Sequence, residues 1–168
     1  MRILGVDPGT VTTGYGVIDS NDDQITLVDY GVFSPPRSPI GERLNYIYRG
    51  LLEVIARHKP DEVAIEEPFL AKNVRSALAV GRAQAVAILA AASHEIPSYE
   101  YTPAQVKQMV ADYGAGSKEQ VQQMVKILLG LSKLPEPADA ADALAVAICH
   151  AREKHLKSLL NEQLEWKP

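Results

Sequence analysis

The order of strand-like and helix-like segments limits the folds that are open to this chain. Residues 3–6, 14–19 and 25–33 read as strands, and short turn signals separate them, including the polar residues 21–23. Consecutive strands joined by such short turns usually pair with one another. These residues therefore predict an antiparallel three-stranded meander.

A different pattern follows the proline-rich break at residues 34–39. Apolar residues recur at helical spacing over residues 40–58, and a strand-like run follows at 62–65. A long alanine-rich helix is expected over 75–95, before a last strand at 98–101. A meander followed by helix, strand, helix and strand predicts an α/β fold, with a five-stranded mixed sheet flanked by helices.

Two capping boxes indicate where short helices begin in the C-terminal half. Thr102 and Ser117 are each followed three residues later by glutamine, a pairing that satisfies the free amides of a first helical turn. A final helix is expected from residue 138 to about 164, and its part beyond about 152 forms a possible helical tail. The length is typical of one domain, so residues 1–168 are expected to form a single domain.

Composition excludes several classes of protein. The single cysteine, Cys149, excludes an internal disulfide framework and a cysteine-rich zinc site. The first residues lead directly into the first expected strand and lack a signal-peptide pattern. The longest apolar stretch, residues 83–92, is too short to cross a bilayer. We therefore expect a cytoplasmic, soluble protein without a membrane partner.

The net charge of −4 is not typical of a nucleic-acid binder, but the charges are unevenly distributed. Residues 70–135 hold seven Lys or Arg against four Asp or Glu, whereas residues 1–69 hold six against eleven. The middle third could supply a cationic surface, and bound metal would offset acidic site residues. Random variation in solvated surface charge explains the same distribution.

Four carboxylates stand where apolar packing is expected. Asp7 and Glu66 each end an apolar strand-like run, and Asp139 and Asp142 lie three residues apart in an alanine-rich helical segment. Buried ionised carboxylates cost several kcal/mol each unless they are paired or bound to metal. Repeated acids at the ends of elements are typical of oxygen ligands for hard cations such as Mg²⁺.

Some of these acids also have purely structural explanations. An Asp before Pro-Gly, as at Asp7, often shapes a turn, and Asp139 suits the positive N-terminal end of a helix. Asp142 is harder to explain in this way, because residues typical of a buried core surround it. Strand side chains alternate, so we expect Glu66 to point into the site and Glu67 to be a solvated neighbour.

Metal-assisted phosphoryl chemistry explains why such a set would be needed. Two divalent ions about 3.5–4 Å apart can hold both the attacking and the leaving oxygen of an in-line phosphodiester displacement. One ion generates hydroxide near neutral pH, the other stabilises the leaving 3′ oxygen, and no covalent protein intermediate is required.

Four motifs together resemble one known family. They are GVDPGT at residues 5–10, AIEE at 64–67, FLAKN at 69–73 and DAADALA at 139–145. In this order and spacing they resemble the RuvC family of Holliday-junction resolvases over nearly the whole chain. The resemblance implies an RNase H-like fold and a Mg²⁺-dependent endonuclease with two ions per active site, for which Mn²⁺ can substitute. It assigns catalysis and metal binding to Asp7, Glu66, Asp139 and Asp142.

The resemblance also assigns residues to DNA. It implies that Phe69 stacks on a base near the junction centre, an interaction worth about 1–3 kcal/mol. It places Lys107 and Lys118 near the scissile phosphate, with Lys118 in a catalytic role. From the residues alone, a phenylalanine packed in the core and solvated helix lysines remain open alternatives. Weaker candidates for contacts to the DNA backbone are Lys72, Arg75 and Arg82.

Assemblies are implied in the same way. The family cuts two opposed strands of a four-way DNA junction as a homodimer, and its dimer packs around the region of the alanine-rich helix. Alanines 83, 85, 87, 90, 91 and 92 would permit such close contact, although they could equally pack on the chain's own sheet. The family also works with a hexameric branch-migration motor and a junction-recognition protein.

Two other functions compete with the resolvase. An actin-like ATPase or sugar kinase would share the sheet order and the Asp7-Pro8-Gly9-Thr10 turn, but 168 residues are too few for the usual duplicated domain. The pair Asp139 and Asp142 also fits a kinase poorly. A junction-binding module without catalysis is the second alternative, and a nuclease for structured RNA is a related one.

Overall fold

A single mixed sheet forms the centre of the protein. The computed structural model describes residues 1–22, 24–68, 74–111 and 117–165, and its strands lie in the order β3-β2-β1-β4-β5. β1 pairs antiparallel with β2, and β2 with β3, whereas β1–β4 and β4–β5 are parallel pairs. The predicted meander and mixed sheet are thus confirmed. The strands are β1 (Arg2–Asp7), β2 (Thr13–Asn21), β3 (Gln24–Phe33), β4 (Glu62–Glu66) and β5 (Ser98–Tyr101).

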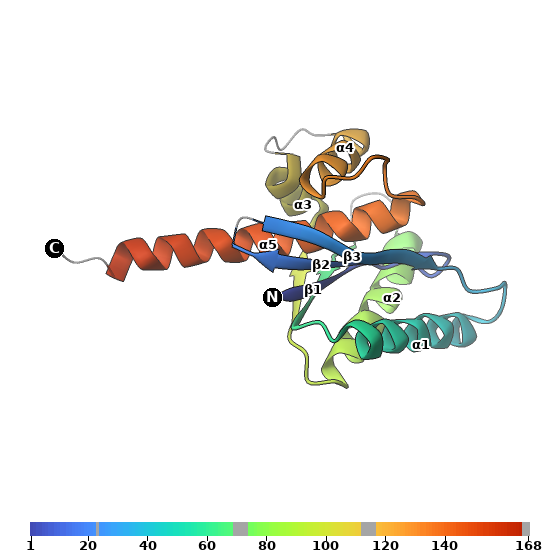
Figure 1. Ribbon diagram of the computed structural model, residues 1–168. Helices are drawn as coiled ribbons and strands as arrows, with labels where there is room; N and C mark the ends of the chain where they lie inside the picture. Colours follow the sequence, from blue (N-terminus) through green and yellow to red (C-terminus); the bar gives the residue numbers. More distant parts are fainter. Residues whose placement is uncertain (23, 69–73, 112–116, 166–168) are drawn as a thin grey trace.

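Helices cover both faces of this sheet (Figure 1). α1 and α2 lie on one face, and α5 lies on the other with α3 and α4 packed beside it. The expected capping boxes at Thr102 and Ser117 are both present, because each hydroxyl accepts from the backbone amide three residues later. The helices are α1 (Ile40–His58), α2 (Val74–Ala92), α3 (Pro103–Ala111), α4 (Lys118–Leu128) and α5 (Ala138–Glu165).

The alternation of side chains along β1 decides which face receives the first acid. Leu4 and Val6 pack into the core formed with α1 and α2, whereas Ile3 packs into the core formed with α5. Gly5 also faces α5, since a Cβ there would lie 2.1 Å from the carbonyl oxygen of Ala143. Side chains two residues apart share a face, so Asp7 points toward the α5 side.

Glycines allow α5 to approach the sheet unusually closely. A Cβ on Gly14 would lie 1.9 Å from the carbonyl oxygen of Asp139, and one on Gly16 would lie 2.6 Å from Leu144 Cδ2. No ordinary side chain fits in those spaces, so the helix backbone rests almost directly on β2. This close contact brings the start of α5 to the edge of the sheet where β1 ends.

The long alanine-rich helix is shorter than expected at its C-terminal end. α2 ends at Ala92 instead of residue 95, because Glu95 adopts φ 57° and the chain turns there toward β5. α2 spans Val74–Ala92 and, among the described helices, is the one long and apolar enough by composition to cross a membrane. This span exceeds the apolar stretch of residues 83–92 that was expected to be the longest. The helix of a globular core passes the same test, and α2 packs against α1.

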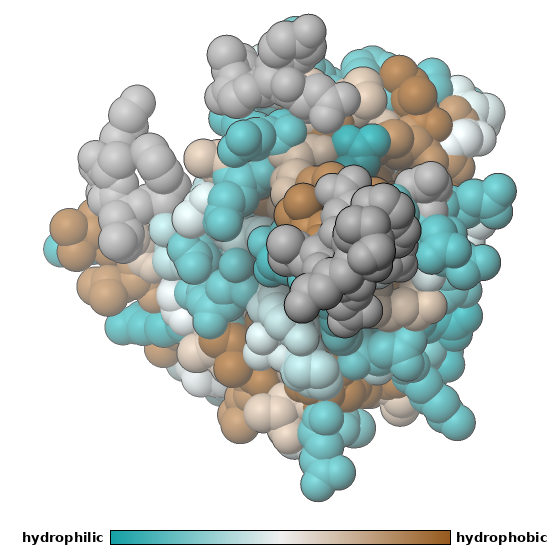
Figure 2. Space-filling view, turned by 90° about the vertical axis from the view of Figure 1, so that its left-hand side faces the viewer, coloured by the Kyte–Doolittle hydropathy of each residue, from teal (hydrophilic) through white to brown (hydrophobic). Residues whose placement is uncertain are grey.

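α5 continues without a break past the end of the sheet (Figure 1). The tail expected from about residue 152 is therefore the second half of the core helix. Leu156, Leu159 and Leu160 on this part are 43–59% exposed. Figure 2, which views this end of the molecule, shows hydrophobic patches among hydrophilic surface.

Candidate active site

The first two acids meet because their strands are parallel neighbours. β1 and β4 are paired with Val6 opposite Ile65, so Asp7 and Glu66 both stand at the carboxyl end of the sheet. The two carboxyl groups are close enough to act on each other's ionisation. Two carboxylates that share a site do not both ionise readily, so one of them tends to keep its proton.

The electrostatics of the cluster favour a proton on Asp7. Burial raises the pKa of Asp7 to about 8, and repulsion from Glu66, Asp142 and Asp139 acts in the same direction. Burial also raises the pKa of Glu66. The metal-free protein therefore cannot carry all these negative charges at neutral pH, and a bound cation would relieve the repulsion.

α5 brings the other two acids to the same place. Asp142 and Asp139 lie in its first turns, and both act electrostatically on Asp7. Asp142 is paired with Lys118, whose Nζ lies 2.6 Å from Oδ2, and Gln122 Nε2 is 3.5 Å from Oδ1. Lys118 begins α4, directly after its N-cap Ser117, so the helix start fixes where this ammonium group lies.

The four acidic side chains offer only oxygen ligands, which are the kind of ligand that Mg²⁺ and Mn²⁺ prefer. Across the described ranges, no three Asp, Glu, His or Cys side chains are already grouped as a ligand set. The ammonium of Lys118 lies on an Asp142 oxygen that a metal would need, and the raised pKa of Asp7 favours its protonated form. Metal binding therefore requires Lys118 to move away and Asp7 to lose its proton, while the donor chemistry fits.

A cleft of about 330 Å³ opens over the cluster. Asp139 does not line it and stands beside it, although it contributes to the field at Asp7 and at Lys118. Both lysines that were assigned to the scissile phosphate do line it. The cleft is lined by Asp7, Pro8, Glu66, Glu67, Pro68, Val80, Pro103, Val106, Lys107, Lys118, Val121, Asp142 and Ala145.

Glu67 was expected to be a solvated neighbour, and that expectation is wrong. It is half-buried and lines the same cleft as Glu66. β4 ends at Glu66, and the amide of Glu67 still donates to the carbonyl of Tyr101 on β5. Gln122 was also missed, although it lies four residues after Lys118 and helical spacing places both on one face of α4.

Of the remaining predicted DNA contacts, only the two arginines lie within the described residues. Arg75 and Arg82 are exposed on α2 and do not line the cleft. Phe69 and Lys72 lie outside the described residues. Of the alanines expected at a dimer contact, 83, 87, 90 and 91 are buried within the chain, whereas 85 and 92 are exposed.

Similarity to known proteins covers almost the entire chain. The family described as crossover junction endodeoxyribonuclease RuvC matches residues 3–150. A protein of that name from Dehalococcoides mccartyi strain BAV1 is 55% identical over 163 residues, which is 96% of this chain and 98% of the relative. Its namesake from Chloroflexus aurantiacus strain J-10-fl is 51% identical over 152 residues, covering 90% and 93% of the two chains.

Solved structures agree with the sequence relatives. Thermus thermophilus RuvC in complex with a Holliday junction substrate superposes with a TM-score of 0.87 at 37% identity, covering 94% of this chain and 97% of that one. The yeast mitochondrial Holliday junction resolvase Ydc2 shares the fold, with a TM-score of 0.64 at 13% identity over 95% and 83% of the chains. Because the family match spans most of the chain and relatives exceed 50% identity, this protein belongs to the RuvC family of crossover junction endodeoxyribonucleases.

Proposed function

We propose that this chain is a structure-selective endodeoxyribonuclease that resolves four-way DNA junctions by paired, symmetric nicks in recombination and DNA repair. The observation that carries the proposal is the convergence of four acids, three of them predicted metal ligands, and two lysines on one cleft, with Asp139 acting electrostatically on Asp7. Relatives of 51–55% identity are named crossover junction endodeoxyribonucleases, which supports this activity over a phosphotransferase.

Each acid has a role in this proposal. Asp7, Glu66, Asp139 and Asp142 would hold Mg²⁺, with two ions per site and Mn²⁺ as a substitute. Bound divalent ions would supply hydroxide near neutral pH and stabilise the leaving 3′ oxygen. The proton on Asp7 must leave before its carboxylate can bind a cation, so the raised pKa of Asp7 opposes metal binding at low pH.

The lysines act on the phosphate. Lys118 is 58% exposed, whereas its partner Asp142 is only 15% exposed, so the ammonium can leave the carboxylate toward the solvent side of the cleft. Its freed charge, with that of Lys107 on the same wall, would pair with non-bridging phosphate oxygens and stabilise the charge that develops there. Lys118 thereby acts in catalysis as well as in DNA binding.

Contacts beyond the cleft are part of the same proposal. Phe69 would stack on a base, and Lys72, Arg75 and Arg82 would contact the DNA backbone. The exposure of Arg75 and Arg82 on α2 supports such contacts. Residues 1–168 would act as one RNase H-like nuclease domain. This domain would cut DNA in the cytoplasm. A branch-migration motor and a junction-recognition protein would deliver the junction.

A second copy of the chain would complete the working unit. Val74, Leu78 and Leu89 on α2 are 73%, 59% and 57% exposed, an unusual exposure for large apolar side chains on one helix. Val74, Leu78 and Leu89 are spaced by four and eleven residues and so share one face of α2. Burying this stripe against its copy would yield a symmetric dimer with two sites, one for each of two opposed strands.

Incubation of the protein with a mobile four-way junction tests the proposal. We expect Mg²⁺-dependent nicks in the junction and little cutting of a linear duplex of the same sequence. Binding without nicks would instead identify a non-catalytic junction-binding module. Preferential competition by structured RNA would identify an RNA nuclease, and ATP turnover without nicks would identify an ATPase.

A further inference from the structure

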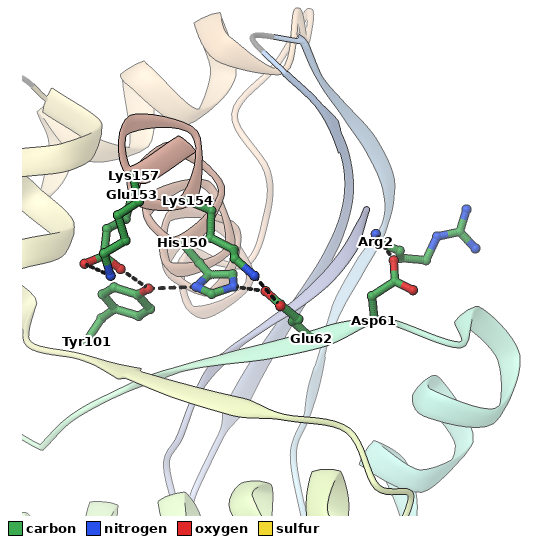
Figure 3. Close-up of polar contacts among 8 residues, drawn as sticks. All are labelled: Arg2, Asp61, Glu62, Tyr101, His150, Glu153, Lys154 and Lys157. Atoms are coloured by element: carbon green, nitrogen blue, oxygen red, sulfur yellow. Dashed lines mark hydrogen bonds and ion pairs between the residues drawn. The ribbon is translucent and has the colours of Figure 1, made fainter. Parts of the chain in front are cut away.

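A second polar cluster lies between α5 and the sheet (Figure 3), and none of its residues lines the cleft. His150 of α5 is 1% exposed, and its Nε2 lies 2.5 Å from Glu62 Oε2 on β4. Its Nδ1 lies 2.7 Å from the hydroxyl of Tyr101 on β5, and that hydroxyl donates to Glu153 at 2.6 Å. The Tyr99 ring is 4.6 Å from the imidazole. His150 therefore joins three elements through directional bonds.

The two carboxylates at the ends of this chain are each held by a lysine as well. Lys154 Nζ lies 2.5 Å from Glu62 Oε1, and Lys157 Nζ lies 3.0 Å from Glu153 Oε1. Both lysines come from α5, as His150 does, and reach outward from the buried imidazole (Figure 3). Each of these two carboxylates is therefore paired with a lysine of α5 in addition to its contact within the chain through His150.

The rest of the contact between α5 and the sheet is largely apolar. Gly5 and Gly14 lie directly beneath the backbone of Ala143 and Asp139, and Ala147 also faces Gly5. Apolar contacts are not directional, so they restrict the rotation and sliding of the helix less sharply than hydrogen bonds do. Hydrogen bonds depend on distance and angle, so a buried polar chain can select one register where packing alone selects it weakly.

That register decides where the acids meet. Asp142 precedes His150 by eight residues on α5, about 12 Å along the helix. Glu66 follows Glu62 by four residues on β4, about 13 Å along the strand, and even spacing places both side chains on the α5 face. α5 and β4 are therefore joined through His150 at one end of their contact. The same alignment brings Asp142 to Glu66 at the other end.

We propose that His150 is a positioning residue for the nuclease reaction, which holds α5 in register with β4 and β5 so that Asp142 and Asp139 meet Glu66 and Asp7. It touches neither substrate nor metal and acts through Glu62 and Tyr101. This inference rests on the proposed function. It adds a requirement, namely that metal affinity and turnover depend on a buried group outside the cleft.

The test compares His150→Leu with two other variants. Leucine fills a similar volume without hydrogen bonds, while Lys154 still pairs with Glu62 and Tyr101 can still donate to Glu153. His150→Gln keeps one donor and one acceptor and is the rescue variant. Ile148→Val removes one buried methyl group from the same helix and is the control for loss of packing.

Three quantities are measured for each protein: the Mn²⁺ binding midpoint by electron paramagnetic resonance without DNA, junction affinity, and the single-turnover nicking rate at saturating protein. For His150→Leu we expect a higher Mn²⁺ midpoint and nicking slowed about tenfold or more, since a misplacement of 1 Å can cost about 100-fold. Junction affinity should be unchanged, and His150→Gln should recover most of the loss.

The thermal midpoint of each variant separates positioning from stability. The inference is overturned if His150→Leu and Ile148→Val lose the same nicking rate when compared at equal distance below their thermal midpoints. It is also overturned if His150→Leu leaves the Mn²⁺ midpoint unchanged. If the wild-type protein binds Mn²⁺ but never nicks junctions, the proposed function fails, while the Mn²⁺ midpoints still decide the positioning role.

Discussion

Replacing Asp7 by asparagine should stabilise the metal-free protein. The folded state raises the pKa of Asp7 from its ordinary 3.8 to about 8, because the carboxyl is buried beside Glu66 and Asp142. Between these values the folded chain keeps a proton that the unfolded chain has released. Stability is therefore lost as the pH rises from about 4 to about 8. Asparagine resembles the protonated carboxyl and removes this penalty.

The size of the expected gain in unfolding free energy follows from the pKa shift of Asp7. Each pKa unit corresponds to about 1.4 kcal/mol, so the penalty at pH 8 is on the order of 5 kcal/mol as an upper limit. At pH 5 the same calculation gives a stability penalty of only about 1.5 kcal/mol, because Asp7 is still protonated in the folded protein. The advantage of Asp7→Asn should thus be large at pH 8 and small at pH 5.

Urea unfolding in EDTA at the two pH values measures this difference. Glu67→Gln is the matched control, since it removes one negative charge from the same cleft without being among the groups that raise the pKa of Asp7. Added Mg²⁺ should then stabilise the wild-type protein far more than Asp7→Asn. If Asp7→Asn shows no gain over the wild type at pH 8, or the same gain at both pH values, the reasoning is refuted.

Three further predictions concern DNA and assembly. Lys118→Ala should slow single-turnover nicking at least tenfold and weaken junction binding much less, because its charge acts on the reacting phosphate; equal losses in rate and affinity would contradict this. Junction binding should weaken steeply with salt, and Arg82→Ala should lower the slope of log K against log salt by about one if it contacts phosphate. Leu78→Asp should convert a dimer to monomers in sedimentation, whereas Leu156→Asp on the protruding part of α5 should not; a monomeric wild type would remove the proposed interface.

Local patterns predicted most elements because each was decided by its own residues. The helical spacing over residues 40–58 and the strand at 98–101 agree with the bounds of α1 and β5. The end of α2 was missed, because Ser93 and Glu95 are compatible with a helix and the turn is set by the pairing of β5 with β4. Period and capping residues do not report such tertiary constraints.

The candidate site was predictable in part for a related reason. Asp7 and Glu66 were recognisable because an acid at the end of an apolar strand is conspicuous in sequence alone. Glu67 was misjudged, since its orientation depends on where β4 stops. The partners of His150 could not be foreseen, because Glu62 and Tyr101 reach it only through the register of α5 on the sheet.

The central claim, that the acid cluster cuts junctions, is tested most directly by mapping nicks on all four strands of a mobile four-way junction. In Mg²⁺ the wild-type protein should nick two opposed strands at symmetric positions and leave ends that can be religated. Asp7→Asn should bind the same junction with nearly unchanged affinity and make no nicks. Nicking by Asp7→Asn at the wild-type rate would contradict the account.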